Sequence, residues 1–324
     1  MMRVLLLTAA QRLPDLSTLY AELGQHHSLE VLRLESQAQR NLRKALRDLD
    51  LSVFERIVLD LPFKNVYRQS RYLARLSGLL IYEEDACQNY LSHSRWHGTF
   101  SQFYRRLTQA RILVTGASVA ARLQAEGFAV SFAPKGYDPE RQFLQSEAAA
   151  IPSREIALGF IGRTASAAYA GRKELLEQLA ASEPLQLLRT EPGDAYRHML
   201  NRIQLFVSAD VGLGEYMGKN FEAMACGCVL LAWRQGSEES AIGLLDGEHL
   251  LLYSNLTELR GHIAALRSNP ARAQQIADAG RAFVEANLSY IHLAARIAQI
   301  LSEPWPVVAP PSGWRAFCQR FGFM

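Results

Sequence analysis

Short apolar runs alternate with amphipathic stretches through the first half of the chain. Six runs have the length of a strand: Val4–Thr8, Leu29–Leu34, Arg56–Leu61, Gly78–Tyr82, Arg111–Thr115 and Ala129–Ala133. Apolar residues at helical spacing fill the gaps between them: Leu16–Leu23, Leu42–Leu49, Val66–Leu76, Phe100–Leu107 and Ser118–Ala125. This alternation predicts a parallel sheet that is covered by helices on both faces.

The second half repeats the same alternation. Its expected strands are Ile156–Ile161, Leu185–Leu188, Leu205–Ser208, Cys228–Trp233 and Leu250–Tyr253. Helical patterns separate them at Lys173–Leu179 and Tyr196–Leu200. A Pro- and Gly-bearing linker between the halves is expected at 134–139 and 148–152. We therefore expect an α/β chain of two tandem Rossmann-like domains that face each other across a cleft, with limits at 1–150 and 151–301.

The last part of the chain has the spacing of consecutive helices, at Leu256–Leu266, Ala271–Ala286 and Ser289–Leu301. Pro270 suits the first turn of the second of these helices. Residues 302–324 form a tail with two proline-rich segments and an amphipathic stretch. We expect this tail to dock on the body of the protein, because one or two helical turns bind a membrane weakly by themselves.

Composition is that of a folded globular protein. The 324 residues are 49% hydrophobic, and the longest apolar runs are far shorter than the roughly 20 residues that cross a bilayer. The amino terminus does not resemble a signal peptide, so we expect a cytoplasmic protein. The four cysteines lack the CxxC spacing of zinc sites or redox dithiols. Cys226 and Cys228 are better explained as small packing residues.

Positive charge is concentrated in the first half. Residues 1–150 carry 19 Lys or Arg against 15 Asp or Glu, and residues 151–324 carry 16 against 17. The excess lies in one stretch: Arg40, Arg43, Lys44, Arg47, Arg56, Lys64, Arg68, Arg71 and Arg75. Such a patch can attract anionic lipid headgroups or a phosphorylated acceptor, and a solvated helix face is the other explanation. Peripheral contact with the inner face of the cytoplasmic membrane is thus an expectation, and no nucleic-acid partner is expected.

A glycine-bearing loop, a short helix and a buried strand follow one another from Gly214 to Leu231. The pattern places Glu222 in the first turn of the helix, with Lys219 three residues before it on the same side. A carboxylate there can accept hydrogen bonds from the two hydroxyls of a ribose, while helix N–H groups favour a pyrophosphate. Gly212, Gly214 and Gly218 let the backbone approach phosphate oxygens. An ordinary ion pair between Lys219 and Glu222 would explain the spacing equally well.

Two common nucleotide motifs are missing from the sequence. The first βα turn, residues 8–12, has no GxGxxG, so it lacks the dinucleotide fingerprint. No GxxxxGK[ST] occurs either, which argues against a P-loop NTPase.

Five segments follow one another from the short helix onward: 222–230, 236–239, 246–253, Asn269-Pro270 and 279–281. They resemble the carboxyl-terminal domain of GT-B glycosyltransferases. Their order is similar to that of the retaining family-4-like transferases (glycosyl transferases group 1) and their relatives with a CgeB-type domain, from about Phe206 to Ala295. Weaker similarities extend over the rest of the chain, at Phe160–Arg163, Ser118–Gly127 and the interdomain Pro-x-Gly-x-Asp of 134–138.

The resemblance implies metal-independent glycosyl transfer without a cofactor, in which Glu222 binds the donor ribose. It also implies that Lys219, with Arg163, Arg172 or Lys173, holds the diphosphate. The donor-binding candidates are Glu222, Lys219, Asn220, Gly218, Gly214, Arg163, Arg172 and Lys173. Members with an E-x7-E motif carry a first Glu eight positions before the second, where this chain has Gly214. Glu215 lies one position closer and is the candidate for sugar contact and catalysis.

The resemblance also implies retention of anomeric configuration, in which the departing phosphate takes the proton of the acceptor. If a protein base exists, the candidates are Glu83, Glu84 and Asp85, which follow an expected strand and so face the cleft. Asp85 is the candidate we select, and a solvated loop is the alternative. Asp48-Leu49-Asp50 is a formal DxD that ends a helical pattern, so chance explains it better. His93 and His97 lack a third metal ligand.

The leading hypothesis is a glycosyltransferase that uses a nucleotide-activated sugar and a glycan or lipid-linked acceptor. The basic first half favours an envelope glycan such as a lipopolysaccharide core. A sugar-nucleotide epimerase of the same fold and a non-catalytic nucleotide-sugar-binding protein remain open alternatives.

Overall fold

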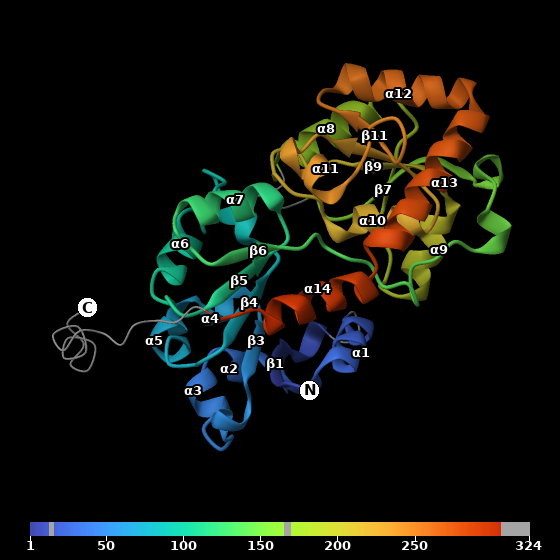
Figure 1. Cartoon of the computed structure of the whole chain (residues 1–324). Coiled ribbons are helices and arrows are strands. Elements are labelled where there is room, and N and C mark those ends of the chain that lie inside the picture. The colour runs from blue at the N-terminus through green and yellow to red at the C-terminus, as the bar shows by residue number, and fades with distance from the viewer. Residues whose placement is uncertain (13–15, 165–169, 306–324) are drawn as a thin grey trace.

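The computed structural model describes residues 1–12, 16–164 and 170–305 (Figure 1). It contains two fully parallel sheets, each with helices on both faces, and so confirms the expected fold class. The first sheet, of order β2-β1-β3-β4-β5-β6, has strands β1 (Arg3–Ala9), β2 (Ser28–Leu34), β3 (Arg56–Asp60), β4 (Leu79–Glu83), β5 (Arg111–Val114) and β6 (Val130–Phe132). The second, of order β11-β10-β9-β7-β8, has strands β7 (Ile156–Ile161), β8 (Gln186–Leu188), β9 (Ile203–Ser208), β10 (Val229–Trp233) and β11 (Leu251–Tyr253).

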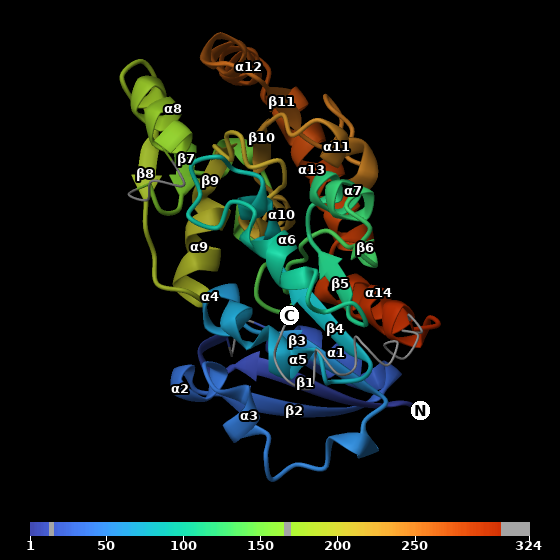
Figure 2. The same cartoon turned by 90° about the vertical axis from the view of Figure 1, so that its left-hand side faces the viewer.

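The helices alternate with these strands, as Figure 2 also shows. Those of the amino-terminal half are α1 (Ser17–His26), α2 (Ser36–Gln39), α3 (Leu42–Ala45), α4 (Phe63–Val66), α5 (Ser70–Leu73), α6 (Thr99–Tyr104) and α7 (Ala117–Ala125). The later helices are α8 (Ala170–Ala180), α9 (Asp194–Arg202), α10 (Gly218–Ala225), α11 (Ser237–Ile242), α12 (Leu256–Ser268), α13 (Pro270–Asn287) and α14 (Tyr290–Ser302). Short 3₁₀ turns are η1 (Ala10–Arg12), η2 (Leu51–Val53), η3 (Tyr67–Gln69), η4 (Ala86–Asn89), η5 (Ser146–Ala148) and η6 (Ile151–Ser153).

Both sheets have the same strand order when each is counted from its first strand. In each, the first strand lies between the second and the third, so the direction of winding reverses between β1 and β3 and between β7 and β9. The carboxyl ends of the strands at such a switch point form the crevice in which open α/β sheets bind ligands. The protein therefore has two potential binding edges.

The alternating side chains of the strands build a core on each face of each sheet. In β1, Leu5 and Leu7 pack with α4 to α7, whereas Val4 and Leu6 pack with α1 and α14. All four side chains are buried, which explains why a buried parallel strand reads as a continuous apolar run.

Helix α14 crosses back from the carboxyl-terminal half to cover the amino-terminal sheet (Figure 1). Its buried side chains, including Leu293, Ile297 and Leu301, belong to the same core as Val4 and Leu6. The predicted limit at residue 301 groups α14 with the carboxyl-terminal domain, whereas its packing groups it with the amino-terminal one. The apolar spacing predicted the helix but not the sheet that it covers.

The first residues after α14 are held at the amino-terminal ends of the first sheet's strands. The Trp305 indole donates to the backbone oxygen of Gln109 at 3.0 Å and lies against the guanidinium groups of Arg56 and Arg111. Arg111 also pairs with Glu303. Residues 302–305 therefore dock on the body, while the rest of the predicted docking tail, 306–324, lies outside the described residues.

Two helical patterns in the basic stretch form shorter helices than expected. The pattern at 42–49 yields only the four residues of α3, and the pattern at 66–76 yields η3 and α5. Polar side chains compete for the backbone here: the Gln69 side-chain amide donates to the oxygens of Gln39 and Asn65. No helix in the described ranges is long and apolar enough to span a membrane.

Candidate functional site

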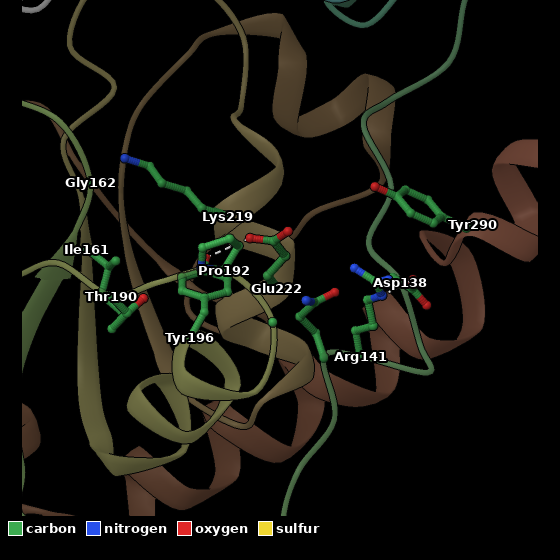
Figure 3. Close-up of a pocket in the computed structure, with 12 residues that line it drawn as sticks. Asp138, Arg141, Ile161, Gly162, Thr190, Pro192, Tyr196, Lys219, Glu222 and Tyr290 are labelled. Atoms are coloured by element: carbon green, nitrogen blue, oxygen red, sulfur yellow. Dashed lines mark hydrogen bonds and ion pairs between the residues drawn. The ribbon is translucent and has the colours of Figure 1, made fainter. Parts of the chain in front are cut away.

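A cavity of about 400 Å³ lies between the second sheet, the interdomain linker and the start of α14 (Figure 3). It is lined by Asp138, Arg141, Gln142, Ile161, Gly162, Thr190, Pro192, Gly193, Tyr196, Lys219, Glu222 and Tyr290. Figure 3 shows Lys219 and Glu222 reaching into it from α10, with Arg141 and Tyr290 on the opposite side. The volume lies in the range of small-molecule sites in proteins.

Helix α10 brings two of the predicted residues into this cavity. The helix begins at Gly218 and ends at Ala225, and the left-handed backbone of Gly227 then leads into β10. Glu222 is therefore the fifth residue of the helix, and its predicted place in the first turn is wrong. No capping side chain marks the start of the helix in the sequence, because Met217 precedes it. Lys219 and Glu222 nevertheless line one cavity.

The Glu222 carboxylate is oriented by a neighbouring phenol. The Tyr196 hydroxyl, on α9, donates to Glu222 Oε2 at 2.6 Å. Burial and the Glu222 charge raise the pKa of Tyr196 well above its ordinary value, so the phenol stays protonated and keeps donating. Glu222 is thus held in place as a hydrogen-bond acceptor on the cavity wall.

Asp210 organises the cations beside the cavity. It is fully buried after β9 and accepts from Arg172 at 2.6 Å and from the Asn220 amide at 2.9 Å, while Lys219 Nζ lies 3.8 Å away. Burial alone would raise the pKa of Asp210, but Lys219 and Arg172 hold it below its ordinary value. One carboxylate is therefore shared by two cations, so the three residues Asp210, Arg172 and Lys219 together carry a net positive charge.

The Lys219 amine is largely buried, which makes its charged form less favourable. Burial lowers the pKa of its amine to about 8, against the opposing charge of Asp210. The amine lies over the Phe160 ring and close to Gly162, where a Cβ would stand 3.3 Å from Nζ and 2.9 Å from the ring. Glycine at 162 thus leaves room beside the amine, and an anionic ligand would meet a poorly solvated positive charge.

The other predicted cations have different positions. Arg172 is buried and donates to Asp210 and to the backbone oxygens of Ala209 and Arg163. It therefore does not line the cavity but holds the residues behind the cavity wall in place. Arg163 is exposed just after β7. Lys173 is exposed on α8 and pairs with Glu177 at 3.6 Å, and it does not line the cavity.

Glu215 and Gly214 face the amino-terminal domain. Glu215 is 1% exposed; its carboxylate pairs with Lys135 at 3.1 Å and accepts from the Thr115 hydroxyl at 3.2 Å. The Gly214 oxygen accepts from the Ser118 hydroxyl at 3.0 Å. Burial raises the pKa of Glu215, opposed by the charge of Lys135. These residues join the two domains and do not line the donor-side cavity.

The three acidic candidates at the end of β4 differ in their burial and in their partners. Glu83 is buried, and burial with the Asp85 charge raises its pKa well above the ordinary value. Glu84 is partly exposed and pairs with Arg12, whereas Asp85 is exposed. Asp85 lies near the Lys135–Glu215 pair, since its charge affects the pKa of both.

Several functional side chains escaped the sequence reasoning: Asp210, Tyr196, Tyr290 and Arg141. Asp210 comes two residues after a predicted strand, which is a detectable signal because carboxyl ends of strands form the site. Tyr290 opens α14 and reaches the cavity only because that helix crosses back. Within the described ranges no group of three or more His, Cys, Asp or Glu is arranged to hold a metal.

Residues 168–300 match the family model described as glycosyl transferase-like. No curated protein sequence matches the chain. Solved structures resemble it over almost its whole length. Sucrose-phosphate synthase from Thermosynechococcus elongatus superposes with a TM-score of 0.67 at 12% identity, covering 93% of this chain and 98% of that one.

Two further structures show the same architecture. HepE from Anabaena, in complex with UDP and glucose, has a TM-score of 0.67 at 13% identity and covers 94% of this chain and 100% of that one. An α-glucosyltransferase in complex with UDP-glucose and DNA has a TM-score of 0.57 at 11% identity, with coverage of 93% and 100%. The chain therefore has the GT-B fold of these glycosyltransferases, and residues 168–300 are similar to the glycosyl transferase-like family, as the sequence predicted.

Proposed function

We propose that the protein transfers a sugar from a nucleoside diphosphate donor, bound in the interdomain cavity, to a hydroxyl of a glycan or lipid-linked acceptor. The observation that carries the proposal is the presence of two opposite charges on one helix: Lys219 and Glu222 of α10 both line the cavity. They match the two recognisable parts of a donor, because a diphosphate needs cations and a ribose offers two hydroxyl donors.

In the proposed complex, Glu222 accepts hydrogen bonds from the ribose hydroxyls while Tyr196 fixes its orientation. Lys219 contacts the diphosphate, and Arg163, exposed after β7, supplies a second cation. Asp210 and Arg172 hold Lys219 and Asn220 in place from beneath. Uridine diphosphate sugars are the first donors to test, since HepE is seen with UDP and glucose.

The reaction exchanges one bond at the anomeric carbon. Its bond to the β-phosphate oxygen breaks, and the electron pair leaves with the nucleoside diphosphate. The acceptor oxygen bonds to the same carbon, and the acceptor proton passes to the departing phosphate. Lys219 stabilises the negative charge that develops, which preorganised cations do well in a site shielded from water. We propose retention of configuration and no metal requirement; transfer that is lost in EDTA and restored by Mg²⁺ would contradict the latter.

A thermal-shift panel of UDP-, GDP-, ADP- and CMP-sugars tests the proposal. A ligand that binds only the folded state raises stability by RT ln(1 + [L]/Kd), about 2.7 kcal/mol at a hundredfold excess over Kd. We expect one class of nucleoside diphosphate sugar to raise the melting temperature of the wild type by several degrees and to lose that effect in Glu222→Ala. No shift with any member of the panel, or a shift with CMP-sugars alone, would overturn the proposal.

A non-catalytic nucleotide-sugar-binding protein is the second candidate. Gly214 stands where the E-x7-E motif has its first Glu, and Glu215 is buried against Lys135 instead of lining the cavity. An assay for slow hydrolysis of the nucleotide-sugar in the absence of acceptor distinguishes an enzyme from a binding protein. An enzyme releases the nucleoside diphosphate over hours, and this release disappears in Lys219→Met, whereas a binding protein releases none.

Helices α2 to α5 form a surface that we call the basic layer, and we propose that it attracts an anionic membrane carrying the acceptor. Eight exposed cations lie in this stretch: Arg40, Arg43, Lys44, Arg47, Lys64, Arg68, Arg71 and Arg75. Among the described residues, only Arg47 of these eight forms an ion pair with a carboxylate. Unpaired surface cations are attracted to anionic lipid by about 1 kcal/mol each.

Co-sedimentation with vesicles tests the basic layer. We expect binding to vesicles that contain phosphatidylglycerol, no binding to pure phosphatidylcholine, and loss of binding in Arg68→Glu/Arg71→Glu. Equal binding to both vesicle types, or none to either, would contradict a role in membrane contact.

A further inference from the structure

The switch point of the amino-terminal sheet carries a charged group that we call the Arg12 network. Arg12 follows β1, and its guanidinium donates to Asp60, the last residue of β3, at 2.7 Å and pairs with Glu84 after β4. The Tyr82 hydroxyl donates to Glu84 Oε1 at 3.1 Å. These residues come from adjacent strands and lie at the carboxyl edge of the sheet.

The Arg12 network has a buried part and a partly exposed part. The Asp60 side chain is 1% exposed and accepts from the Tyr20 hydroxyl of α1, which lies 2.7 Å from the Thr8 hydroxyl. Arg12 and Glu84 are 26% and 28% exposed, so they form the face that a ligand can reach. Burial by itself would raise the pKa of Glu84, but Arg12 and Lys135 lower it, so Glu84 is a carboxylate at neutral pH.

The Arg12 network lies beside the proposed donor cavity. Tyr290 lines that cavity, and burial together with the charges of Glu222 and Glu84 raises the pKa of its phenol. Tyr290 is held by the interdomain linker, because its backbone N–H donates to the Tyr137 oxygen at 2.8 Å and its ring packs on Gly136. Tyr290 therefore links the two sites, since it lines the donor cavity and its phenol is affected by the charge of Glu84.

We propose that the Arg12 network binds the reacting end of the acceptor, and that this end is an uncharged, hydroxyl-bearing unit such as a neutral sugar. The inference rests on the proposed glycosyl transfer and adds the chemical class of the acceptor. Glu84 accepts hydrogen bonds from acceptor hydroxyls, with Arg12 and Tyr82 fixing its orientation.

The balance of charge disfavours a phosphate at this position. One guanidinium is shared between two carboxylates, so the group carries a net negative charge whenever Asp60 is ionised. A phosphate would be repelled by Glu84 and Asp60, whereas a hydroxyl donor gains a charge-assisted hydrogen bond. Any phosphate of a lipid-linked acceptor is then left to the basic layer.

Saturation-transfer NMR with defined probes tests the inference. The probes are methyl α- and β-hexopyranosides of gluco, galacto and manno configuration and the corresponding hexose 6-phosphates, each added to protein saturated with UDP, GDP, ADP or CDP. We expect at least one neutral glycoside to bind the wild type, its 6-phosphate to bind more weakly, and Glu84→Gln to lower glycoside affinity at least tenfold. Binding of no neutral glycoside, or tighter binding of a 6-phosphate than of its parent sugar, would overturn the inference.

The matched control is Glu303→Gln, which alters the Arg111–Glu303 pair at the opposite edge of the same sheet. It should leave glycoside binding unchanged. Equal losses in Glu84→Gln and Glu303→Gln would indicate a structural effect and contradict the assignment. The proposed function fails separately, because it requires a nucleotide-sugar to stabilise the wild type, whatever the acceptor.

Discussion

The carboxyl edges of the two sheets share one topology and have opposite charge. At the edge of the second sheet, one buried carboxylate, Asp210, serves the two cations Arg172 and Lys219. At the edge of the first sheet, one cation, Arg12, serves the two carboxylates Asp60 and Glu84. Each group lies at a switch point of the strand order. The same fold thus offers a positive site for a diphosphate and a negative site for a hydroxyl-bearing acceptor.

Removing the central carboxylate of the positive edge should have the largest effect. Asp210→Asn leaves Arg172 and Lys219 buried without the charge that they share, so the free energy of unfolding should fall by about 3–5 kcal/mol. Urea unfolding monitored by circular dichroism measures it. Asp246→Asn, which removes one partner of the exposed Arg234–Asp246 pair, should cost less than about 1 kcal/mol. Similar losses in both variants would contradict a central role for Asp210.

Removing Glu222, the residue proposed to bind the ribose, should weaken the binding of nucleotides but not the binding of pyrophosphate. Glu222→Ala loses hydrogen bonds to a charged acceptor, worth about 1.5–3 kcal/mol, so nucleoside diphosphate affinity should fall about 10- to 100-fold. Inorganic pyrophosphate should bind at least as tightly as to the wild type. Glu177→Ala on the exposed face of α8 is the control. If calorimetry shows both ligands weakened equally, Glu222 does not contact the ribose.

Raising the pH should weaken nucleoside diphosphate binding at the positive edge, because Lys219 loses its charge. Its pKa is about 8, so the amine is charged below that pH and loses its charge above it. Nucleoside diphosphate affinity should therefore be highest below about pH 8 and fall by up to about tenfold per pH unit above it. Lys219→Arg, which stays charged, should flatten the profile between pH 7 and 9.5. An unchanged slope in that variant would assign the titration to another group.

The smallest effect is expected at the amino-terminal ends of the first sheet's strands. Glu303 is 37% exposed, and Arg111 keeps its contact with the Trp305 ring and its bond to the Pro304 oxygen when Glu303 is changed. Glu303→Gln should therefore lower the free energy of unfolding by no more than about 1 kcal/mol. A loss above 2 kcal/mol in urea unfolding would make this pair unsuitable as a control for Glu84.

The sequence predicted the fold well because buried parallel strands are continuous apolar runs. Each of the expected strands occurs, and Pro270 opens α13 as expected. The crossing of α14 could not be predicted, since a helical pattern does not reveal which sheet its apolar face covers. The shortness of the helices in the basic layer was not predicted either. It depends on hydrogen bonds between residues far apart in the sequence, such as the bond from the Gln69 side chain to the Gln39 oxygen.

The candidate site was predicted only where its residues are neighbours in sequence. Lys219 and Glu222 lie on one helix and were found together. Asp210 and Arg172 are 38 residues apart, and Arg12 and Glu84 are 72 apart, so no local pattern joins them. The charges of both edges arise from such distant pairs, which is why their opposite sign appears only in the structure.

The most direct test of the positive edge is the affinity of two lysine variants for UDP, GDP, ADP and CDP, measured by calorimetry at pH 7. Lys219→Met removes a cation from the cavity wall, whereas Lys173→Met removes one from the solvent-exposed face of α8. We predict that Lys219→Met weakens the preferred nucleotide at least tenfold and that Lys173→Met changes it less than twofold. Unchanged affinity in Lys219→Met would contradict the assignment of the diphosphate to this edge.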